Sequence, residues 1–166
     1  MIRPRIVAAV ALAVAVTGCA DRVASPALGA APSPASIAGL VMTGAPRRPG
    51  AVVTLSARLA SGAPVSRAGA FLARIEYDTA QFAFEGQGGA TSGIAAFHAE
   101  RGVLRVAGAS LDGYAGGVLF NARFRVTGPA PDGEVRLVID ELRDVNLADR
   151  LPAAPAARTA LLRPWR

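Results

Sequence analysis

The chain has 166 residues and a formal net charge of +6, and 52% of its residues are apolar. This length favours one domain with terminal extensions. The basic excess lies in the ends of the chain, because residues 50–150 hold 10 Arg against 11 Asp and Glu, a net charge of −1. A nucleic-acid-binding domain carries its basic stripe on the folded part, so we expect no nucleic-acid partner. The basic ends are either solvated or lie against anionic lipid.

The first segment of the chain has the features of an export signal. Arg3 and Arg5 precede an uninterrupted apolar run of 11 residues, 6–16. A run of this length matches the hydrophobic region of a secretory signal peptide and is too short to cross a bilayer as a helix. We therefore expect residues 1–18 to be a signal peptide that is removed on export.

The single cysteine follows directly, in the sequence Val16-Thr17-Gly18-Cys19. This stretch resembles the lipobox of bacterial lipoproteins. The resemblance implies that the thiol of Cys19 is diacylated and that the new amino terminus is acylated as well. One acyl chain binds a membrane only marginally, whereas two or three anchor a protein stably. The alternative is a plain secretory signal, which leaves a lone exported cysteine without a disulfide partner.

Residues 19–39 are rich in Ala, Pro and Ser, a composition that buries too little apolar surface to offset the loss of chain entropy. We interpret them as a semi-extended tether that lifts the next domain off the bilayer. In enterobacterial-type lipoproteins an Asp directly after the cysteine favours the inner membrane, whereas here Ala20 follows Cys19. The resemblance therefore implies an exported, lipid-anchored envelope protein, at the outer membrane or cell surface.

Residues 40–162 have the pattern of an all-β domain. Apolar and polar residues alternate at period two in four segments: 53–59, 71–77, 120–126 and 135–139. Shorter apolar segments that fit a strand are 37–43, 82–84, 104–106 and 159–162. Turns rich in Gly and Asp-Gly separate these segments and supply the positive φ angles that tight turns need. The pattern predicts a two-sheet β-sandwich of seven to nine short strands.

The domain contains five segments in a characteristic order: AVVTLSARL, ARIEYDTAQFAFEG with its Tyr77-Asp78 pair, GVLRVAG, GGVLFNARFRV and GEVRLVIDELRDVN. This order resembles the cohesin domain, in the superfamily that also contains cellulose-binding sandwiches. The resemblance implies a jelly-roll sandwich of about nine strands that binds proteins. In cellulosomes the partner is a dockerin, a paired-helix calcium module. The partner of this chain is unknown, and a dockerin-like partner is expected only by analogy.

The resemblance also implies that a partner docks on one sheet face. On that face we place Leu72, Arg74 and Glu76 on one strand, with Arg105 and Arg136 on neighbouring strands. A mixed apolar and Arg patch suits a protein interface. The alternative is that these are ordinary outward residues of a sheet.

We expect no catalytic site, metal site or cofactor. His98, the only histidine, is followed by Glu100, but no activated nucleophile with an orienting group accompanies them, and Ser92 and Ser110 carry no mark of one. An acidic cluster lacks the glycine of a calcium loop and is interpreted as a solvated strand edge and loop. Its members are Asp140, Glu141, Asp144 and Asp149.

Two other functions stay open, namely carbohydrate binding and a structural role in the envelope or secretion machinery. Sugar binding usually needs exposed aromatic faces, and most aromatic residues fall on the apolar side of the alternation. These are Phe71, Tyr77, Phe82, Phe84, Phe120 and Phe124. Phe97 and Tyr114 are left undecided. In the tail, 163–166, Trp165 is either an interfacial anchor or without a role.

Overall fold

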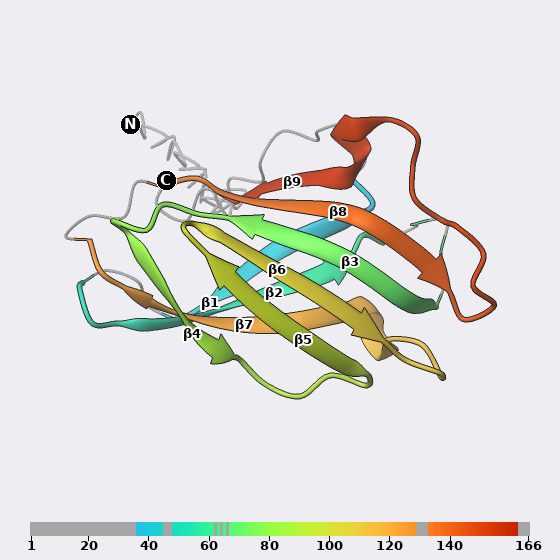
Figure 1. Ribbon diagram of the computed structural model, residues 1–166, viewed down its shortest axis with the longest axis horizontal. Coiled ribbons are helices and arrows are strands. Elements are labelled where there is room, and N and C mark those ends of the chain that lie inside the picture. Colours follow the sequence, from blue (N-terminus) through green and yellow to red (C-terminus); the bar gives the residue numbers. More distant parts are fainter. Residues whose placement is uncertain are drawn as a thin grey trace, which may run out of the picture.

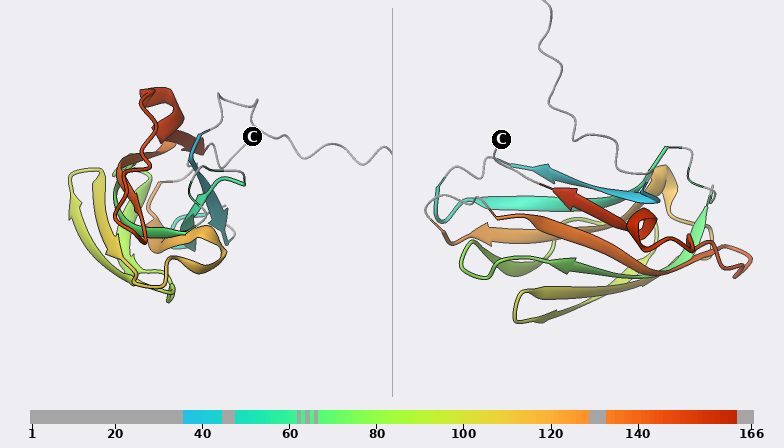
Figure 2. Two further views of the ribbon diagram at one scale, coloured as in Figure 1. Left: turned by 90° about the vertical axis from the view of Figure 1, so that its right-hand side faces the viewer. Right: turned by 90° about the horizontal axis from the view of Figure 1, so that it is seen from above.

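The computed structural model describes residues 36–44, 48–61, 63, 65, 67–128 and 133–162. In this part of the chain nine strands form two antiparallel sheets that face each other (Figures 1 and 2). Sheet A has the strand order β1-β2-β7-β4, and sheet B has the order β5-β6-β3-β8-β9. The strands are β1 (Ala38–Thr43), β2 (Val52–Leu59), β3 (Ala68–Glu76), β4 (Phe82–Gln87), β5 (Ile94–Glu100), β6 (Val103–Ala109), β7 (Val118–Val126), β8 (Val135–Asp144) and β9 (Thr159–Leu162). The predicted all-β sandwich is confirmed.

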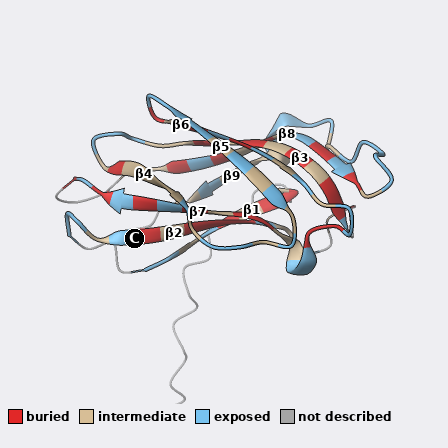
Figure 3. Cartoon of the chain, turned by 60° about the horizontal axis from the view of Figure 1, so that its bottom comes forward, coloured by how far each residue is buried: buried red, intermediate tan, exposed pale blue. Residues whose placement is uncertain are grey.

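The alternation along each central strand explains why the sheets pack face to face. On β3 the side chains of Phe71, Ala73 and Ile75 are buried, and the residues between them lie on the outer side. Successive side chains of a strand point to opposite faces, so one face enters the core and the other meets solvent. The banding of buried and less buried residues along the strands is visible in Figure 3.

Aromatic rings join the two sheets at the centre of the core. Phe120 on β7 lies 5.7 Å from Phe71 on β3 and 6.1 Å from Phe97 on β5, measured between ring centroids. Tyr114 contacts Phe71 edge-on and donates a hydrogen bond to the carbonyl of Ile94 at 2.8 Å. Burial raises the pKa of Tyr114 to about 12. Both rings left undecided by the sequence, Phe97 and Tyr114, therefore pack inward.

The two lateral sides of the sandwich are closed differently. On one side the backbone N–H of Ile37 donates to the carbonyl of Ala157 at 2.7 Å, next to β1 and β9. On the other side Phe84 of β4 stacks on Phe97 of β5. The strand β1 begins two residues before the predicted domain boundary at residue 40, because Ile37 and Ala38 are buried in the core.

The predicted signal peptide, Cys19, most of the tether and the tail 163–166 lie outside the described residues. The described residues contain no helix long and apolar enough to span a membrane. Their only helices are two short 3-10 turns, η1 (Ala115–Gly117) and η2 (Pro155–Arg158).

Candidate interaction face

The outer face of sheet B is a regular grid because its strands are paired in register. Four cross-strand rows run from β5 through β6 and β3 to β8. Along the sheet they are Ile94-Ala109-Ala70-Arg143, Ala96-Ala107-Leu72-Glu141, His98-Arg105-Arg74-Val138 and Glu100-Val103-Glu76-Arg136. Successive rows are two residues apart along β5, β6 and β3, about 7 Å; on β8 an irregularity opposite Leu72 and Ala73 places Glu141 and Val138 three residues apart. The first two rows are mainly apolar, and the last two carry most of the charge.

The structure brings together the five residues placed on an interaction face by the sequence. Leu72, Arg74 and Glu76 alternate along β3, the middle strand of sheet B. Arg105 lies on β6 directly opposite Arg74, and Arg136 lies on β8 directly opposite Glu76. All five therefore share one surface. Their role in binding stays a prediction.

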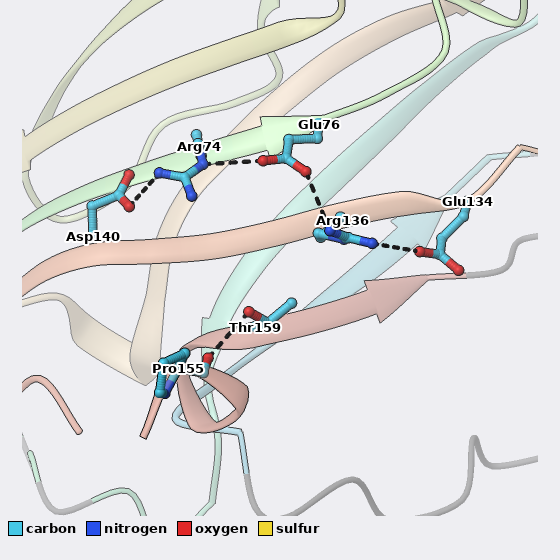
Figure 4. A network of polar contacts seen from close by, with 7 residues as sticks. All are labelled: Arg74, Glu76, Glu134, Arg136, Asp140, Pro155 and Thr159. Carbon is cyan, nitrogen blue, oxygen red and sulfur yellow. Dashed lines mark hydrogen bonds and ion pairs between the residues drawn. The ribbon is translucent and has the colours of Figure 1, made fainter. Parts of the chain in front are cut away.

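A chain of ion pairs fixes the charged half of this face (Figure 4). Arg74 donates to Glu76 Oε1 at 3.1 Å and to Asp140 Oδ1 at 2.5 Å. Glu76 in turn lies 3.7 Å from Arg136, which also pairs with Glu134 at 3.4 Å. Half-exposed pairs of this kind contribute little to stability, but shared partners restrict the long side chains to few conformations. Residue spacing places Asp140 in an acidic cluster and does not predict its contact with Arg74.

Arg105 is one of the exposed cations of the grid. It faces Arg74 across the strand pair, and Arg74 is already balanced by two carboxylates. Among the described residues Arg105 makes no salt bridge. Its other cross-strand neighbour, His98, lies 3.0 Å from Glu100, and this hydrogen bond lowers the pKa of the Glu100 carboxyl. The charged half of the face thus exposes to solvent a guanidinium that makes no salt bridge with the described residues.

The apolar half of the face consists of small and aliphatic side chains. Ile94 is 77% exposed, and Leu72 is half-buried between alanines of the neighbouring strand. Alanines of β5, β6 and β3 give this part of the sheet small outward side chains. An apolar surface beside an exposed Arg has the composition of a protein interface.

The polar residues considered for catalysis have structural or surface positions. Within the described residues no group of three His, Cys, Asp or Glu side chains could hold a metal ion. His98 and its partner Glu100 are both exposed. The hydroxyl of Ser92 donates to the carbonyl of Gly113 and accepts from the N–H of Ala115, and that of Ser110 donates to the carbonyl of Ser92. These serine hydroxyls hold loops together.

The interpretation of Asp144 as a solvated carboxylate is wrong. Asp144 is only 8% exposed and accepts hydrogen bonds from Arg150 at 2.7 and 2.9 Å. The backbone N–H groups of Asn146 and Ala148 also donate to it. The bond from Arg150, followed by these backbone donors, holds the pKa of Asp144 below its usual range despite burial. Asp144 therefore organises the loop that follows β8.

We predict that Asp144→Asn lowers stability at neutral pH and that its effect disappears in acid. A carboxyl whose pKa is lowered in the folded state stabilises above its unfolded pKa of about 3.9, and this contribution is lost as the pH falls through the folded value. Urea midpoints at pH 7 and pH 3 measure the difference. An equal loss of stability in Asp144→Asn at both pH values would contradict this role of the Asp144 carboxylate.

The topology defines the class: a nine-stranded β-sandwich of two antiparallel sheets. No protein-family model and no curated protein matches the sequence. The solved structures that match are cohesin modules. A type I cohesin–dockerin complex from Clostridium thermocellum aligns with a TM-score of 0.54 and 14% identity, over 77% of this chain and 99% of that chain.

Two further structures extend the likeness beyond that type. A non-cellulosomal cohesin from Archaeoglobus fulgidus aligns with a TM-score of 0.54 and 19% identity, over 77% of this chain and 91% of that one. A type III cohesin from Ruminococcus flavefaciens aligns with a TM-score of 0.51 and 15% identity, over 81% and 90%. The domain is thus cohesin-like in fold, as the sequence predicted.

Proposed function

We propose that this chain is a protein-binding module of the bacterial cell envelope that holds its partner on the outer face of sheet B. The observation that carries this proposal is the grid itself, in which an apolar half adjoins ordered ion pairs and the exposed Arg105, which makes no salt bridge within the described part of the chain. Interfaces are enriched in Arg and place apolar side chains at their centre. A partner with aliphatic side chains and a carboxylate would match both halves.

A dockerin-type partner is the specific form of this proposal. Two of the similar structures are complexes of a cohesin with a dockerin. The small side chains of the alanine-rich rows of sheet B leave room for a secondary-structure element of the partner to lie along the sheet. We infer binding rather than catalysis, because the polar groups near the face are engaged in ion pairs and loop contacts.

The described aromatic residues favour a protein over a polysaccharide as the partner. All eight are buried or half-buried, and they lie between the sheets rather than on a surface. Stacking on sugar rings needs aromatic faces that are open to solvent. Retardation in cellulose or chitin affinity gels would count against the protein-binding proposal, and we expect none.

Partner capture should depend on β3 and not on the opposite face of the sandwich. The chain is immobilised, and proteins retained from an envelope extract of its own cells are identified. We expect the triple change Leu72→Ala, Arg74→Ala and Glu76→Ala to lower the affinity for a retained protein at least tenfold, because truncation of central interface residues costs about 1–4 kcal/mol.

The matched control alters one apolar and two charged residues on the outer face of sheet A: Val52→Ala, Arg123→Ala and Arg125→Ala. All three are exposed, and Val52 lies directly opposite Arg125. We expect this control to bind like the wild type. Equal binding by the β3 variant, or equal loss in both variants, would overturn the assignment of the face.

We further propose that the module is anchored through lipid on Cys19. The lipobox-like sequence and the Pro-rich segment that follows it support this anchor. Cys19→Ser removes the thiol that would be acylated, so the protein should move from the membrane fraction to the soluble envelope fraction. A Cys19→Ser protein that stays in the membrane fraction, or a mature wild-type protein that retains residues 1–18, would contradict the anchor.

A further inference from the structure

Beside the apolar end of the interaction face lies an open depression of about 680 Å³. It is lined by the starts of β3 and β5, the ends of β6 and β8, the loop before β5 and the loops that follow β6 and β8. The ribbons of these strand ends lie on the right of Figure 1. Three of its lining residues, Ile94, Leu111 and Leu147, are 77%, 97% and 66% exposed. Half of the six exposed large aliphatic side chains of the described chain therefore gather around this one hollow.

The walls of the depression are held in place by the fold. Leu147 has a φ of +64°, a backbone conformation that costs energy for a bulky residue and that tends to occur at functional positions. The loop that carries it is fixed by the hydrogen bonds of Asp144 to Asn146 and Ala148. The opposite wall is held by Tyr114, which bonds the carbonyl of Ile94. The hydrogen bonds of the fold thus hold the apolar rim in a defined conformation.

The rim also carries a carboxylate. Asp112 is exposed, and among the described residues its side chain makes no hydrogen bond or salt bridge, while its backbone carbonyl accepts from Arg67. The second acidic lining residue, Asp144, is neutralised by Arg150. An occupant that complements this site has a large apolar group next to a positive charge.

One segment of the chain has this chemistry. Trp165, the only tryptophan, lies between Arg163 and Arg166 and follows Pro164. A Trp side chain buries about 150–250 Å², and the volume of the depression is in the usual range for ligand sites, about 300–1,000 Å³. The flanking guanidinium groups match the carboxylate of Asp112.

The segment cannot reach the depression of its own chain. Leu162 pairs with Val135 at the start of β8, whereas the depression lies at the end of β8, near Asp144. Nine strand steps separate these positions, about 30 Å. Trp165 follows Leu162 by three residues, which span at most ~11 Å.

We propose that the depression binds Trp165 of a second copy of this chain. Two sandwiches placed side by side and antiparallel bring each tail to the depression of the other copy, so the contact closes as a two-fold dimer. A contact of one anchor residue is weak in solution, with a midpoint between about 0.1 and 1 mM. Chains tethered to one membrane reach comparable effective concentrations. The depression shares Ile94, Ala109 and Ala70 with the first row of the outer face of sheet B, but this proposal does not require that face to bind another protein.

Fluorescence of the single tryptophan tests the proposal with two complementary variants. The donor is the exported chain with Cys19→Ser, Leu111→Asp and Leu147→Asn, which keeps Trp165 and loses two of the three exposed apolar side chains of the rim. Asn tolerates positive φ better than Leu, so this change does not strain the loop. The acceptor is the exported chain with Cys19→Ser and Trp165→Ala, which keeps the depression and emits no tryptophan fluorescence.

We expect the emission of the donor to move to shorter wavelength as acceptor is added, with a midpoint below 1 mM. Asp112→Asn in the acceptor should weaken binding about threefold, and added salt should remove that difference. An acceptor with Val52→Asp, which alters an exposed aliphatic residue of sheet A, should bind unchanged.

Three results would overturn the proposal. The first is no emission shift up to 1 mM acceptor. The second is an equal shift with an acceptor that itself carries Leu111→Asp and Leu147→Asn, because Trp165 would then bind elsewhere. The third is a shift seen only with anionic phospholipid vesicles, which would make the membrane surface the site of Trp165.

Discussion

Replacement of Phe120 by alanine is expected to lower the free energy of unfolding by about 3–5 kcal/mol, the usual range for a buried Phe. Phe120 is fully buried on β7 and contacts Phe71 and Phe97 of the opposite sheet. Its loss therefore opens a cavity between the two sheets and removes two ring contacts that join them. A domain of this size has a total stability of about 5–15 kcal/mol, so the variant should lie near the limit of folding.

Equilibrium unfolding in urea, followed by far-ultraviolet circular dichroism, measures the effect. The control is Val52→Ala on the outer side of sheet A, where the side chain is 43% exposed. We expect this change to stay within about 0.5 kcal/mol of the wild type. A Phe120→Ala protein with wild-type stability would contradict the position of this ring in the core.

Gly108→Ala is expected to destabilise the domain by about 1–3 kcal/mol, because it overfills a packed site. A Cβ atom at Gly108 would lie 2.5 Å from the hydroxyl of Tyr114 and closer still to the ring of Phe71. Tyr114 cannot move aside without breaking its hydrogen bond to Ile94. The added methyl group therefore disturbs Tyr114, the residue that connects the core to the start of β5.

Gly39 on β1 provides a control of the same chemical change. No atom lies within 4 Å of a Cβ built there, and its backbone is extended. Gly39→Ala should leave stability unchanged or raise it by up to about 1 kcal/mol, since alanine restricts the unfolded chain. Similar losses of stability in Gly108→Ala and Gly39→Ala would show that the close packing around Gly108 does not cause the destabilisation.

The strands that the sequence predicts best are those with a clear difference between their two faces. On β3 and β7 large apolar residues alternate with charged ones, so burial of one face follows from the residues themselves. The strand β5 gave no such signal. Its sequence IAAFHAE has alanine on both faces and a single large inward side chain, Phe97. Its position at the edge of sheet B is decided by pairing with β6.

The candidate site, too, could be predicted only in part from the sequence. The period of two places Leu72, Arg74 and Glu76 on one face, and this requires no knowledge of the other strands. The contact of Arg74 with Asp140 depends on the register of β3 and β8 and on the irregularity between Leu72 and Ala73. Burial of Asp144 depends on a loop that returns Arg150 to the end of β8. Neither register nor loop path is visible in residue type and spacing.

Side-chain oxidation footprinting of the free protein and of its complex with the captured partner tests most directly whether the outer face of sheet B is the binding surface. We expect oxidation of Leu72, Ile94 and His98 to fall in the complex, while Val41 and Val52 on sheet A react as in the free protein. Protection of Val41 and Val52 with unchanged reactivity of Ile94 and His98 would contradict it.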